Sequence, residues 1–104
     1  MSTKKPYTLK DLERDMGPLT FGQALWAHRK CEEISLKDFA KKLGISSQSL
    51  CDIEKGRRIP SVHRVVKIAA KIKEPADTWL ALALEDMVRS VNANLTVEVK
   101  KKIS

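Results

Sequence analysis

Helix start and stop signals recur along this chain and divide it into short helical segments. Thr20 and Gln23 have the spacing of a capping box, in which each side chain accepts a hydrogen bond from the backbone N–H of the other residue. Residues that favour helix starts precede four later apolar segments: Ser35, Ser46, Ser61 and Asp77. Glycine or proline follows most of the segments: Gly17-Pro18, Gly44, Gly56 and Pro75. The chain is therefore predicted to be nearly all α-helical.

Apolar residues at helical spacing predict which face of each segment is buried. The segment after Ser35 has its predicted inner face at Leu36, Phe39, Ala40 and Leu43. The segment after Ser61 has it at Val62, Val65, Val66, Ala69 and Ile72, and the last segment at Leu80, Ala83, Leu84, Met87, Val88 and Val91. Trp79 has two interpretations: it completes the core, or it joins Leu82 in a surface for a partner chain.

The pattern changes near the end of the chain. Leu95, Val97 and Val99 alternate with polar residues, which is typical of a β-strand. A single strand cannot satisfy its own backbone hydrogen-bonding groups, so it pairs with another copy, pairs with another protein, or frays. The alternation favours pairing, and the alternative is a disordered basic tail.

Net charge narrows the classes of partner. The 104 residues carry 20 Lys and Arg against 13 Asp and Glu, a formal net charge of +7. The excess is concentrated between Glu54 and Lys73, where seven cations face one acid, and in the tail at residues 100–102. Such a surplus suits a nucleic acid, an anionic membrane surface, or simple solubility.

Other function classes find little support in the residues. The chain has no apolar stretch long enough to span a membrane and no signal-peptide pattern at its start, so we expect a cytoplasmic protein. His28, Cys31, Cys51 and His63 lack the usual spacings of zinc ligands. No nucleophilic triad, phosphate-binding glycine loop or carboxylate pair is evident, so we expect no enzyme, no metal and no cofactor.

The segment 36–55, LKDFAKKLGISSQSLCDIEK, carries the most specific pattern. Ala40 is small enough for a second helix to cross closely, and Gly44 can adopt the left-handed conformation of a tight turn. Ile45, Leu50 and Ile53 have the spacing to fill the angle between the two helices. These coincidences predict a helix-turn-helix.

The sequence from about Leu19 to Leu84 resembles the Cro/cI-like, or XRE, helix-turn-helix family of DNA-binding regulators. The resemblance rests on Ala27-x-Arg29, Phe39-Ala40, residues 43–46, Ile53-Glu54-x-Gly56 and Pro60-Ser61. It implies an all-α, five-helix, lambda-repressor-like domain. With the signals at the two ends, we expect residues 1–18 to form an extension with a short helix, 19–92 the domain, and 93–104 a C-terminal β-strand and basic tail.

The resemblance also implies roles for particular residues. Arg29 and Glu54 match the positions of a structural salt bridge, and Ala40 and Gly44 match the packing positions. The recognition helix is expected over Ser46–Lys55, and the matching DNA-binding positions are Ser46, Ser47, Gln48, Ser49, Asp52, Lys55, Arg57, Arg58 and Arg64. Many family members carry Gln where this chain has Leu36, which cannot make the corresponding phosphate contact.

Gln48 is the best candidate for reading a base, because its amide can bond adenine N6 and N7 together. Asp52 has two interpretations: it accepts from cytosine N4, or DNA repels it to the edge of the interface. Lys55, Arg57, Arg58 and Arg64 are expected to bind phosphates.

The predicted function is that of a sequence-specific transcriptional repressor, which binds a palindromic operator in double-stranded DNA as a homodimer. Small proteins of this family often serve as antitoxins of the HigA type, so a small toxin protein is a further expected partner and its sheet edge a place for the C-terminal strand. The alternative is a basic module that binds proteins or anionic membranes without reading DNA sequence. These alternatives differ in whether Gln48 matters.

Overall fold

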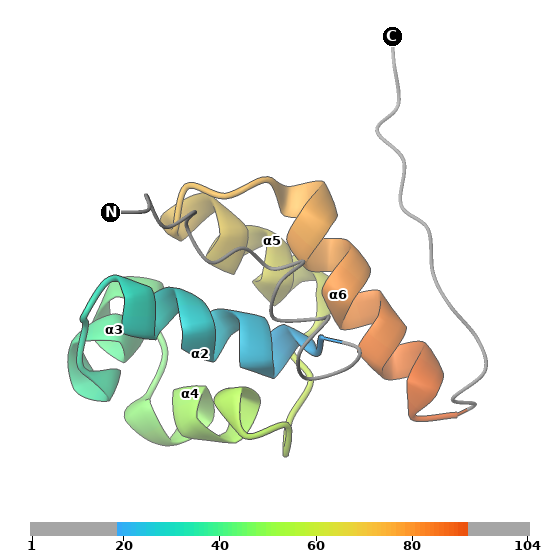
Figure 1. Cartoon of the computed structure of the whole chain (residues 1–104), viewed down its shortest axis with the longest axis horizontal. Helices are drawn as coiled ribbons and strands as arrows, with labels where there is room; N and C mark the ends of the chain where they lie inside the picture. The colour runs from blue at the N-terminus through green and yellow to red at the C-terminus, as the bar shows by residue number, and fades with distance from the viewer. Residues whose placement is uncertain (1–18, 92–104) are drawn as a thin grey trace, which may run out of the picture.

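A computed structural model of the chain describes residues 19–91, and these fold into five α-helices. Helices α2 (Phe21–Cys31), α3 (Leu36–Leu43), α4 (Ser47–Glu54), α5 (Val62–Lys71) and α6 (Ala76–Arg89) follow one another through short connections. Helices α3 and α4 lie together at one end, and α5 packs against the longer α6 (Figure 1). Helix α2 contacts both α4 and α6 and so joins the two pairs.

The fold is all-α, and this corrects the predicted combination of helices with a β-strand. Every regular element over residues 19–91 is helical. The strand expected within residues 93–104 and the short helix expected within 1–18 both lie outside the described residues, so neither belongs to the fold established here. The boundaries proposed for the two ends of the domain likewise stay predictions.

Side-chain caps begin four of the helices, as the sequence predicts. Thr20 and Gln23 form both hydrogen bonds of the capping box. The hydroxyls of Ser35, Ser46 and Ser61 each accept from the backbone N–H three residues ahead. The predicted cap at Asp77 is wrong, because α6 begins after Pro75, whose ring fixes φ near the value that a helix start needs, and Asp77 lies within the first turn.

The core forms where all five helices meet. Its largest fully buried side chains come from every helix: Phe21, Leu25, Phe39, Leu50, Ile53, Val65, Ile68 and Trp79. Trp79 is 2% exposed and meets the Phe21 ring edge-on at 5.6 Å between centroids. Its role in the core is thereby confirmed, and the interpretation of Trp79 as a partner surface is wrong.

The inner faces of α5 and α6 differ in part from the prediction. In α5, Val65, Ile68 and Ala69 are buried, as is Ile72 directly after the helix, whereas Val62 and Val66 are 45% and 41% exposed. The buried stripe keeps the expected spacing but is rotated by part of a turn, because several apolar residues compete for the same face. In α6, Trp79 and Ala83 are buried, and Val91, which lies beyond the end of the helix, is 85% exposed. Within residues 19–91, no helix is both long and apolar enough to cross a membrane.

Candidate nucleic-acid interface

The turn between α3 and α4 has the geometry that the sequence predicts. Gly44 adopts φ 74°, ψ 30° and ends α3 with its backbone N–H donating to carbonyls in the last turn. A residue with a side chain is strained in this left-handed conformation, which explains the glycine. The N–H of Ile45 donates to the carbonyl of Ala40, which is 1% exposed at the crossing of the two helices. The helix-turn-helix and the packing roles of Ala40 and Gly44 agree with these contacts.

A buried ion pair fixes the far end of α4. The guanidinium of Arg29 donates to both carboxylate oxygens of Glu54, at 2.8 and 3.1 Å. A third donation, at 3.1 Å, reaches the carbonyl of Ile34 in the connection between α2 and α3. The side chains of Arg29 and Glu54 are only 11% and 5% exposed. This fork therefore ties α2, the following connection and the end of α4 into one rigid unit.

The leading end of α4 faces solvent. Ser46, Ser47 and Gln48 are exposed, and Leu50 and Ile53 on the opposite side of the helix are buried. Ser49 is half-buried, its N–H donates to the Ser46 hydroxyl, and the two hydroxyl oxygens lie 3.0 Å apart. Ser46 and Ser49 thus stabilise the start of the helix, while Ser47 and Gln48 project from it.

Gln48, Asp52 and Arg57 form a connected group on the outer face of α4. Gln48 Nε2 donates to Asp52 Oδ1 at 3.0 Å, and Arg57 Nε donates to the same oxygen at 3.1 Å. The backbone N–H groups of Arg57 and Arg58 also donate to the Asp52 carbonyl. The Gln48–Asp52 spacing of four residues could have signalled this pair in the sequence. The chain turns at Gly56, where φ is 78°, and this turn brings Arg57 back to Asp52. No sequence pattern indicated that contact.

This arrangement bears on both interpretations of Asp52. Its charge is already balanced by Arg57, and its Oδ1 atom is already occupied by Gln48 and Arg57. Asp52 therefore accepts hydrogen bonds from Gln48 and from Arg57 within the same chain. The expected contacts of Asp52 and Arg57 with DNA stay predictions.

Three other predicted phosphate-binding cations form no ion pair within residues 19–91. Lys55 ends α4, Arg58 lies in the following loop, and Arg64 lies in the first turn of α5. All three are exposed. Together with Ser47 and Gln48 they place exposed hydrogen-bond donors around α4.

Leu36 lies at the start of α3 and is half-buried against the core. Many members of the Cro/cI-like family, which the sequence resembles, carry Gln at this position. Leu36 instead packs against the core and contributes to the stability of the fold. Cys51 is half-buried, and Arg57 Nη2 lies 3.7 Å from its sulfur. In the described part of the chain, no three residues among His, Cys, Asp and Glu gather in a way that could hold a metal ion.

Gly22 has a packing role that the sequence did not indicate. An added Cβ on Gly22 would overlap the carbonyl oxygen of Ile53, so α2 and α4 approach closely at this point. Glycine two residues into a helix start gives no pattern that distinguishes close packing from chance. The close approach explains how α2 can brace the helix that carries Gln48.

Comparison with known proteins agrees with this geometry. Residues 29–79 match a family model described as helix-turn-helix, which is of the Cro/cI type. The matched stretch runs from Arg29 to Trp79 and includes α3, α4 and α5. No curated protein matches the chain. The fold, the exposed leading end of α4 and this match together support a helix-turn-helix domain that binds double-stranded DNA in the regulation of transcription.

Proposed function

We propose that this protein is a sequence-specific transcriptional repressor, which inserts the leading end of α4 into the major groove of its operator. The observation that carries the proposal is an exposed Gln48 on a helix whose far end is fixed to α2. The Arg29–Glu54 fork holds the far end of α4, and Asp52 holds the Gln48 amide. With Nε2 donating one of its two hydrogens to Asp52, Gln48 keeps one N–H and its carbonyl oxygen for a base.

Those two groups match adenine in the major groove, where N7 accepts a hydrogen bond and N6 donates one. Lys55, Arg58 and Arg64 surround the helix as phosphate contacts, which supply affinity without sequence information. A protein of this design reads one half of an operator per chain. We therefore propose a homodimer on a palindromic site, with one recognition helix for each half-site.

Selection of bound duplexes from a random pool tests this proposal. The expected result is a palindromic consensus for the intact chain and a changed preference at one position of each half-site for Gln48→Ala. Arg58→Ala is the matched control, and it should weaken all sequences alike. Selection that returns no consensus would contradict the proposal.

The same variants address the alternative of a basic surface that binds proteins or anionic membranes. That alternative predicts binding to vesicles of anionic lipid that depends on Arg58 and is indifferent to Gln48. Dependence on Gln48 in DNA binding favours the repressor.

An antitoxin role is the more particular version of the proposal and rests on resemblance to small regulators of this family. Such a protein represses its own promoter and binds a small toxin protein. Co-expression with the product of a neighbouring gene, followed by copurification of the two, tests it. Failure of every neighbouring product to copurify would remove the antitoxin role and leave the repressor.

A further inference from the structure

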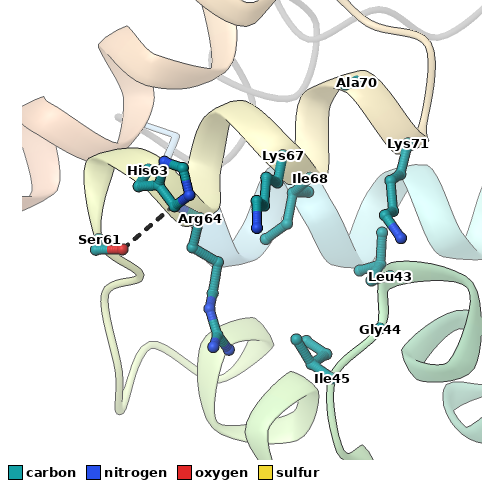
Figure 2. A pocket seen from close by; sticks show the side chains of 10 residues that line it. All are labelled: Leu43, Gly44, Ile45, Ser61, His63, Arg64, Lys67, Ile68, Ala70 and Lys71. Carbon is teal, nitrogen blue, oxygen red and sulfur yellow. Dashed lines mark hydrogen bonds between the residues drawn. The ribbon is translucent and has the colours of Figure 1, made fainter.

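A cationic groove lies between α5 and the turn that precedes α4. This α5 groove encloses about 490 Å³, and Arg64, Lys67 and Lys71 line one side of it. Leu43, Ile45 and Ile68 contribute apolar side chains to its lining. Figure 2 shows the three cationic side chains on the side of α5 that faces the turn and the helix after it, with Lys71 nearest to Gly44 and Arg64 directed toward α4.

The three cations of the α5 groove lack partners within residues 19–91. No carboxylate lines the groove, and none of the three forms an ion pair there. Most of the other arginines within residues 19–91 are paired: Arg29, Arg57 and Arg89 each donate to a carboxylate. Arg58, like Arg64, has no carboxylate partner in this part of the chain.

The spacing of Arg64, Lys67 and Lys71 along α5 brings three positive charges together, which is unfavourable unless an anion lies between them. Positions 64, 67 and 71 fall on one face of α5, and like charges three or four residues apart on a helix repel. The ammonium of Lys71 extends over the turn, only 3.7 Å from where a side chain on Gly44 would begin. An anion in the groove relieves this repulsion.

The groove continues toward the cations already placed at the interface. A second hollow, of about 220 Å³, lies beside Pro60 and between Arg58 and Arg64. Ser61 and Arg64 line both hollows, so the two adjoin. The resulting track runs from Arg58 along α5 to Lys71, and Gly44 and Ile45, which lead into α4, form its opposite wall.

We propose that the α5 groove binds backbone phosphates of the DNA strand that flanks the bases read by α4, with Lys67 and Lys71 as phosphate-binding residues. The inference rests on the proposed function and extends the interface beyond the residues assigned to it above. The charge, the open and elongated shape and the adjacency to the leading end of α4 all suit a polyanionic strand. These contacts add affinity and salt dependence, and they add no base preference.

The test compares the intact chain with the double variant Lys67→Gln/Lys71→Gln on the selected duplex. Lys41→Gln/Lys42→Gln is the matched control, because it removes the same charge from two exposed positions on α3 that line neither hollow. Affinity is measured from 50 to 200 mM salt. Loss of two phosphate contacts lowers the salt slope by about 1.8, so the intact chain should lose about 12 times more affinity across this range than the groove variant.

The control should keep a slope close to that of the intact chain, and both double variants should select the same consensus as the intact chain. A groove variant with the slope of the control would overturn the inference. A duplex trimmed to the bases that α4 reads provides a second measurement, because the difference between groove variant and intact chain should vanish on it.

Two results distinguish failure of the groove inference from failure of the proposed function, and DNA from a small anion as the ligand of the groove. If Gln48→Ala alters the consensus while the groove variant behaves like the control, the groove inference fails and the proposed function stands; an intact chain with no consensus removes the proposed function instead. Titration with inorganic phosphate, followed through the amide signals of Gly44 and Ile45, tests a free anion. If these amide signals shift on addition of phosphate and the groove variant binds DNA like the intact chain, the ligand of the groove is a small anion and not the DNA backbone.

Discussion

At the residue scale, base recognition depends on how firmly the Gln48 amide is oriented. Asp52 accepts from Gln48 Nε2 and from Arg57 Nε through the same oxygen, so one carboxylate limits the motion of both side chains. A flexible glutamine costs about 0.5–1.5 kcal/mol to immobilise on a base. Because Asp52 already restricts the Gln48 side chain in the free protein, less conformational entropy is lost when Gln48 binds a base.

Substitution of Asp52 separates orientation from charge. Asp52→Ala should lower discrimination for the preferred base by roughly 2-fold to 10-fold, because Gln48 loses its anchor. The same change should raise affinity for unrelated duplexes, since a negative charge is lost and Arg57 is released. Competition binding with selected and scrambled duplexes measures both effects.

Asp52→Asn is the control for this prediction. Its amide oxygen can still accept from Gln48 Nε2, so discrimination should stay near that of the intact chain while affinity for unrelated duplexes rises. Equal discrimination by the alanine and asparagine variants would show that Asp52 does not position Gln48.

The Arg29–Glu54 fork carries a second prediction at this scale. Arg29→Ala leaves the Glu54 carboxylate, 5% exposed, without its partner, and this should lower the free energy of unfolding by about 3–5 kcal/mol. Arg29→Met/Glu54→Met removes both charges and should cost much less than the sum of the two single changes. Denaturation in urea of the intact chain, Arg29→Met, Glu54→Met and the double variant measures the coupling, and strictly additive losses would contradict a coupled pair.

At the scale of elements, the close approach of α2 to α4 fixes how α4 stands on the domain. Gly22→Ala places a methyl group against the backbone carbonyl of Ile53, which cannot move without shifting α4. We expect a loss of about 1–3 kcal/mol in the free energy of unfolding, as for other overpacked sites, and weaker DNA binding.

Gly56→Ala is the control for the Gly22 substitution. Its φ of 78° makes alanine unfavourable by about 1–2 kcal/mol, but no atom beyond the two neighbouring residues lies within 4 Å of the added methyl. Gly56→Ala therefore introduces backbone strain without moving a helix. The packing of α2 against α4 should be the same as in the intact chain. Amide chemical shifts in α4 should move in Gly22→Ala and stay in place in Gly56→Ala.

A carboxylate joins α6 to the start of α2 and makes stability depend on pH. Asp86 Oδ2 accepts from the Phe21 N–H at 2.9 Å, and Asp86 Oδ1 accepts from Arg89 Nη2 at 2.7 Å. Burial raises the pKa of Asp86 above its ordinary value of 3.8, against the opposing effect of these two donors. Between the ordinary and the raised pKa, the folded chain binds more protons than the unfolded chain.

The contribution of Asp86 to the free energy of unfolding is therefore present below its ordinary pKa and falls as pH rises through its raised pKa. Asp86→Asn lacks this titration. The difference between the unfolding free energies of the intact chain and Asp86→Asn, measured in urea at a series of pH values from the ordinary pKa of 3.8 upward, should shift against the intact chain as pH increases. A difference that shifts the other way would mean that the two hydrogen bonds outweigh burial.

Local signals in the sequence predicted the elements well, because caps and turns are determined by a few neighbouring residues. Thr20, Ser35, Ser46 and Ser61 cap their helices, and Gly44 turns the chain as expected. Faces were predicted less well where apolar residues are abundant, so Val62 and Val66 were expected inside and lie outside. Two adjacent apolar stripes on one helix satisfy the same periodicity, and only the packing of α6 against α5 chooses between them.

Contacts between distant segments were harder to predict. The Arg29–Glu54 pair came from resemblance to a family, since 25 residues separate the partners. The approach of Gly22 to Ile53 and the bond from Phe21 to Asp86 have no local pattern. At the interface, the sequence indicated the exposed residues of α4 but not that Asp52 holds Gln48 and Arg57 together.

At the scale of the whole molecule, charge is divided between fold and surface. Asp52, Glu54 and Asp86 accept from arginines or from the backbone and so stabilise the described domain. Arg58, Arg64 and Lys67 have no such partners within residues 19–91, and they lie from the end of α4 into the first turns of α5. These three cations of the described domain therefore lie where the proposed function needs positive charge.

The proposed homodimer makes a geometric prediction for the operator. Two recognition helices on one side of B-form DNA contact half-sites about 34 Å, or roughly 10 base pairs, apart. Inserting about 5 base pairs between the half-sites places them on opposite faces of the duplex, where a rigid dimer contacts one half-site at a time. We expect the affinity to fall to that of an isolated half-site, while the mass of the complex still corresponds to two chains. Substitution of 5 base pairs outside the two half-sites, which leaves their spacing intact, should preserve binding. Unchanged affinity for the duplex with the insertion would mean that each chain reads its half-site independently.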